Sequence, residues 1–250
     1  MSIPYQYEYF SAFTSASKNL KWSISALSIF PLLPNITELS DHRWLVILTQ
    51  ILAAIGLQNL SKKKLRSKSV ALATLWLALL TQTLVFVSSL FALSPPKTSI
   101  FLAWVTFISS TVIPLYEREE EELRILAIFS SSFTCYSLLS TCYEPLFLLL
   151  LMISLYFWMT SEKYQHQSCV LTIDKINMED LKLVITFLFF VFLAFFGCGN
   201  IASLNSFSPS SIIPFVHIYS PHLMALLLFM KVILPFIPVC SVFLVIIRRG

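Results

Sequence analysis

The chain has 250 residues, of which 57% are hydrophobic and only 12% are charged. Soluble domains carry roughly 25% charged residues, so this composition excludes an ordinary soluble protein. The net charge of +4 does not indicate nucleic-acid binding, because the basic residues gather in short loops between apolar segments. We expect an all-α fold, a polytopic transmembrane helical bundle of about eight spans. Most spans should be plain helices, since phenylalanine is abundant and glycine is scarce.

Apolar segments recur along the whole chain, and several approach the roughly 20 residues that a helix needs to cross the hydrocarbon core. In chain order they are Trp22–Leu33, Trp44–Leu60, Val70–Leu93, Ile100–Tyr116, Ile125–Thr141, Pro145–Met159, Leu183–Phe196 and Pro221–Ile247. The first segment is short. A tilted span that begins near Phe13, with Lys18 and Lys21 reaching to the interface, is an alternative for it.

The loop between the second and third segments sets the expected orientation. It holds Lys62, Lys63, Lys64, Arg66 and Lys68. Short basic loops stay in the cytoplasm, and alternation then places Ser94–Ser99, Cys142–Glu144 and Gly197–Ser220 on the lumenal side. Arg248 and Arg249, after the last segment, come out on the cytoplasmic side, which agrees. The polar connection Thr160–Lys182 is expected to be a cytoplasmic linker with a helical end that leads into the next span.

The sequence contains no nucleophile elbow, phosphate loop, dinucleotide fingerprint or paired-histidine zinc motif. We therefore expect no catalytic residue, metal site or cofactor in this chain. Its cysteines should be small packing residues: Cys135, Cys142, Cys169, Cys198 and Cys240. A lumenal disulfide between Cys142 and Cys198 is an alternative.

The connection Gly197–Ser220 is the most polar interruption of the apolar segments on the expected lumenal side. Asn200, Ser203, Asn205 and Ser206 supply neutral groups that both donate and accept hydrogen bonds, which suits sugar hydroxyls or lipid head groups. The alternative is a turn whose serine and asparagine side chains cap the adjoining helices. These residues are candidates for substrate contact.

Two charged residues complete the set of candidate substrate-binding residues. Lys231 lies ten residues after Pro221, or about 15 Å into the last segment at 1.5 Å per residue. A charge at that depth is costly and indicates a functional site, unless the side chain reaches back to the interface. Glu144 begins another segment on the same side and is either a partner for Lys231 or a solvated carboxylate at the interface.

Several stretches together carry a resemblance to a known family. They are Ile29–Pro34, Leu139–Phe147, Phe195–Phe207, Tyr219–Met224 and Lys231–Phe236, which occur in family order. They resemble the C-terminal membrane region of the GPI ethanolamine phosphate transferases of the PIG-N type. The resemblance extends from near Trp22 to near Cys240, and the lumenal stretch is its most specific part.

The resemblance implies that residues 1–250 form the membrane domain of a multi-pass transferase of the endoplasmic reticulum, active in GPI-anchor biosynthesis. Such enzymes transfer ethanolamine phosphate to the first mannose of the GPI precursor. The family places catalysis and zinc in a lumenal domain, which this sequence lacks. The implied partners are membrane lipid, the GPI precursor and phosphatidylethanolamine as substrates, and that lumenal catalytic domain, with no nucleic acid.

We expect this chain to give the scaffold of such an enzyme and a groove for its lipid substrate. The alternatives are a free-standing transporter or lipid-handling membrane protein, or an inactive truncated product.

Overall fold

The structure is a computed structural model, and it describes residues 43–60, 68–91, 97–116, 121–141, 144–166, 178–198, 214–215 and 220–249. Within these ranges the regular structure is entirely α-helical. The helices are α2 (Arg43–Leu60), α3 (Lys68–Leu90), α4 (Lys97–Tyr116), α5 (Glu121–Leu138), α6 (Glu144–His166), α7 (Met178–Gly197), α9 (Pro221–Ile233) and α10 (Phe236–Arg249).

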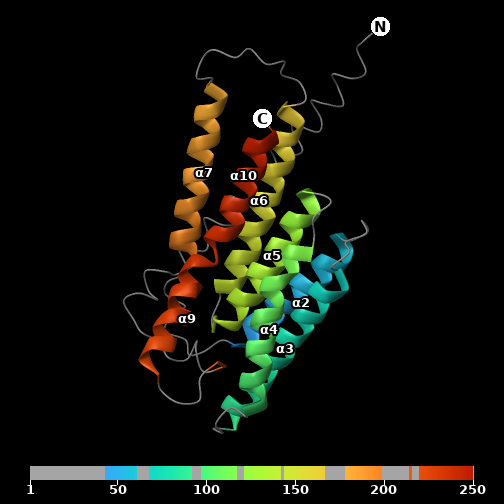
Figure 1. The fold of residues 1–250 in the computed structure, drawn as a ribbon, viewed down its shortest axis with the longest axis vertical. Helices are drawn as coiled ribbons and strands as arrows, with labels where there is room; N and C mark the ends of the chain where they lie inside the picture. Colours follow the sequence, from blue (N-terminus) through green and yellow to red (C-terminus); the bar gives the residue numbers. More distant parts are fainter. Residues whose placement is uncertain are drawn as a thin grey trace.

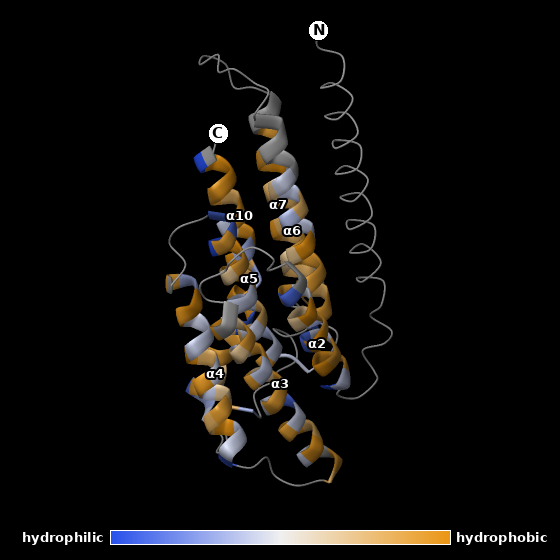
Figure 2. Cartoon of the chain, turned by 90° about the vertical axis from the view of Figure 1, so that its right-hand side faces the viewer, coloured by the Kyte–Doolittle hydropathy of each residue, from blue (hydrophilic) through white to orange (hydrophobic). Residues whose placement is uncertain are grey.

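The helices run up and down along the long axis of the molecule, as Figure 1 shows. Neighbours in sequence pack side by side, with α2 on α3, α3 on α4 and α4 on α5, while α10 packs on α5, α6 and α7. Apolar residues cover most of the helical surface along its length (Figure 2). Large hydrophobic side chains such as Trp76, Phe101 and Phe192 are more than half exposed. This outward apolar surface is what a helix bundle presents to lipid.

Three of the described helical stretches are long and apolar enough to cross a membrane: Val70–Ser88, Lys97–Leu115 and Pro221–Arg248. Arg43–Gln58, Glu144–Thr160 and Leu183–Gly197 are shorter apolar helices. Helices therefore occupy the last seven of the expected apolar segments. The first one, Trp22–Leu33, lies outside the described residues.

The last expected segment, Pro221–Ile247, is not one uninterrupted helix. It divides into α9 and α10 at Leu234 and Pro235. Proline has no N–H to donate and its ring clashes with the carbonyl four residues earlier, so Pro235 releases the backbone carbonyl of Lys231. The expected segment is matched by the candidate span Pro221–Arg248, and the break at Leu234 and Pro235 is a detail within it.

The expected linker Thr160–Lys182 also begins later than the sequence suggested. Helix α6 continues to His166 and α7 begins at Met178, so both helices extend into the polar stretch. Residues 167–177 lie outside the described residues.

Helix α5 occupies the centre of the bundle. It contacts α2, α3, α4, α6 and α10, and every residue from Phe129 to Leu138 is buried. Hydroxyl residues dominate this stretch and its continuation: Ser130, Ser131, Ser132, Thr134, Ser137, Ser140 and Thr141. Small hydroxyl side chains let neighbouring helices approach closely, and most of these bond to carbonyls of their own helix. The expected span Ile125–Thr141 is therefore the interior helix, which composition alone did not indicate.

The turn between α5 and α6 lies well inside the ends of its neighbours. Gln82 of α3 bonds to the last turn of α5, and α3 continues eight residues further to Leu90, or about 12 Å. Figure 1 agrees, since α3 and α4 reach further toward the lower end of the view than α6 does. The charged and polar residues around this turn are thus placed in the interior of the bundle rather than at its edge.

Candidate functional site

A buried ion pair joins α6 to α9 beside the α5–α6 turn. The ammonium Nζ of Lys231 lies 2.7 Å from Oε2 of Glu144, and the two side chains are only 6% and 14% exposed. Glu144 stands in the first turn of α6 and Lys231 in the last turn of α9. The dipole of a helix stabilises a negative charge at its N-terminus and a positive charge at its C-terminus. Each residue of the pair is therefore stabilised by its own helix as well.

The Lys231 side chain is held by a carboxylate and is almost fully removed from solvent. Buried Met224 and Leu227 precede it on α9, at the spacing of one helix face. Glu144 was expected either to pair with Lys231 or to be solvated, and in the structure it pairs with Lys231.

The hydroxyl of Tyr136 links the centre of the bundle to the end of α7. It donates to the backbone carbonyl of Cys198 at 3.1 Å, and both residues are fully buried. Cys198 is a free thiol, so the alternative of a disulfide with Cys142 is not realised. Cys142 itself lies outside the described residues.

Close packing against α6 fixes the same end of α7. A Cβ atom placed on Gly197 would lie 1.9 Å from Cζ of Phe147, a ring that is completely buried. Contacts that short do not occur between real atoms, so α7 can approach α6 here only because residue 197 is a glycine. Gly197 therefore has a packing role at the point where the polar connection after α7 begins.

Two buried glutamines bind the C-terminal end of α5 from α2 and α3. Nε2 of Gln50 donates to Oγ of Ser137 at 2.9 Å, and Nε2 of Gln82 donates to the carbonyl of Ser137 at 2.8 Å. The last carbonyls of a helix have no partner within the helix, so Gln82 supplies one. The side-chain oxygens of both glutamines have no hydrogen-bond partner among the described residues.

An aromatic cluster lies on the α4 side of the same region. Phe215 packs edge-on against Trp104 and Phe107, with ring centroids 5.4 and 5.7 Å apart. The indole Nε1 of Trp104 donates to the backbone carbonyl of Phe215 at 3.1 Å. The polar connection between α7 and α9 is thus anchored to the bundle at Cys198 and at Phe215.

The structure brings together only part of the set of candidate residues. Glu144 and Lys231 are in direct contact, whereas Asn200, Ser203, Asn205 and Ser206 lie outside the described residues. Within the part of the chain that the structure describes, no group of three or more histidine, cysteine, aspartate or glutamate side chains could hold a metal ion. The arrangement is a charge-compensated pair of side chains that are mostly removed from solvent.

Comparison with known proteins gives the family. The family model for phosphatidylinositolglycan class N (PIG-N) matches residues 2–250. The chain belongs to the PIG-N family.

Curated relatives of this PIG-N family member carry a common name. GPI ethanolamine phosphate transferase 1 of Homo sapiens is 28% identical over 259 aligned residues, which cover 90% of this chain and 27% of the human protein. The mouse protein is 28% identical with the same coverage, and that of Schizosaccharomyces pombe is 29% identical over 59% of this chain. The chain spans about a quarter of the length of the relatives that it matches most fully. No solved structure matches it.

Sequence reasoning missed the polar residues that bind the C-terminal ends of α5 and α7 in this PIG-N chain. Gln50 and Gln82 each stand inside a long apolar segment, and a polar side chain there is costly unless it finds a partner in the bundle. That signal was available and would have marked both residues. Tyr136 gave no signal, because a tyrosine among apolar residues is equally typical of the membrane interface.

Proposed function

We propose that this chain is the membrane part of a transferase that attaches ethanolamine phosphate to the first mannose of the GPI precursor in the endoplasmic reticulum membrane. Its bundle would comprise about eight spans. The observation that carries the proposal is the PIG-N family match over residues 2–250, with relatives named GPI ethanolamine phosphate transferase 1. In this proposal the chemistry and its zinc belong to a lumenal catalytic domain, and this chain gives the scaffold and the groove for the lipid substrate.

The charges of Glu144 and Lys231 support a contact with the transferred group. An ethanolamine phosphate group carries one ammonium and one phosphate. The carboxylate of Glu144 complements the ammonium, and the ammonium of Lys231 complements the phosphate. The two side chains are 2.7 Å apart and mostly removed from water. An arriving head group would therefore replace each side chain's ion-pair partner at a site that is already desolvated.

The polar connection after α7 supports the same contact. Asn200, Ser203, Asn205 and Ser206 would offer neutral hydrogen bonds to sugar hydroxyls or to the phosphate ester. The anchors of this connection at Cys198 and Phe215 hold its ends on the bundle. We propose these four residues, with Glu144 and Lys231, as the substrate-facing set.

Complementation tests the function. The chain is co-expressed with a separately encoded catalytic domain of a curated relative in cells that lack the transferase, and surface display of a GPI-anchored reporter is measured. Restored display supports the proposal, and the catalytic domain expressed alone is the control. Absent display, despite stable insertion of both parts, would contradict it in favour of an unrelated lipid-handling protein or an inactive product.

A charge swap tests the substrate contact separately from the scaffold. The double variant Glu144→Lys/Lys231→Glu keeps an ion pair at this position but reverses its direction. We expect the swapped chain to fold with some loss of stability, because both charges then stand at the unfavourable ends of their helix dipoles. At a matched amount of inserted protein it should still lose reporter display, because each charge then faces its like on the head group. Lys97→Glu alters an exposed lysine at the same end of the bundle and should leave display unchanged. Full display with the swapped pair would show that the pair is a scaffold only.

A further inference from the structure

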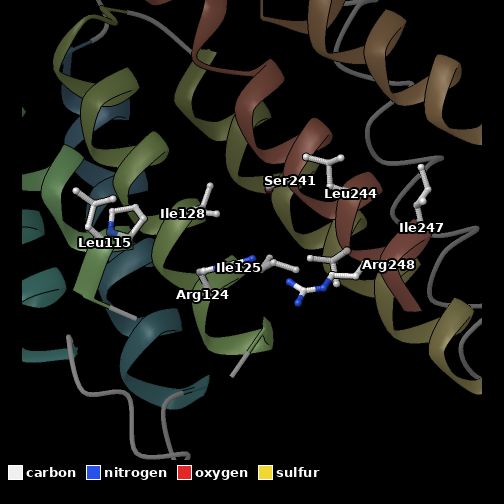
Figure 3. A pocket seen from close by; sticks show the side chains of 10 residues that line it. Leu115, Arg124, Ile125, Ile128, Ser241, Leu244, Ile247 and Arg248 are labelled. Carbon is white, nitrogen blue, oxygen red and sulfur yellow. The ribbon is translucent and has the colours of Figure 1, made fainter. Parts of the chain in front are cut away.

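A second site stands out at the opposite end of the bundle from Glu144 and Lys231. A groove of about 700 Å³ opens between the end of α4, the start of α5 and the end of α10. Figure 3 shows its lining, with Arg124 from α5 and Arg248 from α10 on either side of one gap.

The charges at the mouth of the groove are mixed. Arg248 is exposed, with Nε 3.9 Å from Oε1 of Glu121, a separation too long for a strong ion pair. Arg124 has no ion-pair partner among the described residues. Two guanidinium groups therefore face one gap, and Glu121, in the acidic first turn of α5, lies beside that of Arg248. A ligand with one phosphate and one ammonium fits this arrangement better than a purely anionic ligand.

The walls of the groove are apolar and lead away from the charges. They include Leu115, Ile128, Leu244 and Ile247. Ser241 lies seven residues before Arg248 on α10, so this lining extends about 10 Å from the charged end toward the middle of the bundle. Leu115 and Leu244 are 69% and 65% exposed, which leaves apolar surface open to an acyl chain.

We propose that this groove binds one zwitterionic glycerophospholipid of the leaflet at the end of the bundle where α10 ends. Arg124 and Arg248 hold its phosphodiester, the first turn of α5 faces the cationic arm of its head group, and the apolar walls take an acyl chain. Basic pockets between spans on the cytoplasmic side are known sites for lipid phosphates. This site lies at the opposite end of the bundle from the pair that we assign to the transferase substrate, so it does not depend on the proposed function.

Native mass spectrometry of the purified full chain tests the proposal. The probes are phosphatidylcholine, phosphatidylglycerol and diacylglycerol of matched acyl chains. We expect retention of phosphatidylcholine above both other lipids. Arg124→Gln and Arg248→Gln should each lower its apparent affinity about fivefold, and the double variant about 25-fold, if each contact is a single exposed charge contact. Glu121→Gln should reduce the preference over phosphatidylglycerol.

Lys97→Gln is the matched control, since it removes an exposed positive charge at the far end of the bundle and should leave retention unchanged. Arg248 is 72% exposed in its side chain, so Arg248→Gln keeps the test valid if the double variant fails to fold. Equal retention of diacylglycerol, or a loss with Lys97→Gln as large as with Arg248→Gln, would overturn the proposal. Preference for phosphatidylglycerol would overturn the zwitterionic assignment.

Discussion

Breaking the ion pair between Glu144 and Lys231 should destabilise the bundle strongly. Lys231→Met removes the ammonium and leaves the carboxylate of Glu144 buried, and Glu144→Gln does the reverse. Removing one partner of a buried pair costs about 3–5 kcal/mol, and these side chains are only 14% and 6% exposed. The double variant Glu144→Gln/Lys231→Met leaves no buried charge and should recover most of the loss.

Thermal unfolding of the detergent-solubilised chain measures these effects. Each single variant should lower the midpoint by about 6–20 °C, taking 2–4 °C per kcal/mol for a chain of this size. The double variant should then unfold at a temperature above both singles, which is the signature of coupling in a double-mutant cycle. Single variants within 2 °C of the parent, or additive losses in the double variant, would show that the pair is not the desolvated contact seen in the structure.

Three further substitutions probe the packing around this pair, each by thermal unfolding in detergent. Gly197→Ala should cost about 1–3 kcal/mol, because its methyl group meets a buried ring. The control Gly56→Ala has open space around it and should be neutral or slightly stabilising. Equal effects of the two substitutions would contradict the close approach of α7 to α6. Gln82→Leu should cost about 1 kcal/mol, since it removes the hydrogen bonds that Gln82 donates to the carbonyls of Ser137 and Leu138 at the end of α5. Tyr136→Phe should cost a similar amount, about 1 kcal/mol, through loss of the hydrogen bond to the end of α7, and an unchanged midpoint would refute that role.

The positions of the helices could be predicted because apolar length leaves few alternatives. Each described helix overlaps an expected segment. The contact between Glu144 and Lys231 was foreseeable for a related reason, since a charge in an apolar segment needs a partner. The division at Pro235 could also be predicted, because a proline inside an apolar segment interrupts the helix.

The central position of α5 could not be predicted in the same way. Its serines and threonines satisfy their hydroxyls within their own helix, so they are as compatible with a lipid-facing span as with an interior one. Which helix is interior depends on how several helices pack at once, and one sequence does not contain that information. Gln50 and Gln82 both point to α5, and reading them together would have been the best available indication.

The burial of α5 has a consequence for how the protein enters the membrane. α5 is not among the described helices that are apolar enough to cross on their own, and it carries Glu121 and Glu122 in its first turn. A nascent segment of this kind partitions poorly into lipid by itself, and its last turn gains the hydrogen bonds of Gln50 and Gln82 only when α2 and α3 pack on it. Correct topology would then require that α4, α5 and α6 leave the insertion machinery and enter the membrane together. Substitutions in α5 should therefore lower the amount of correctly inserted protein before they affect its activity.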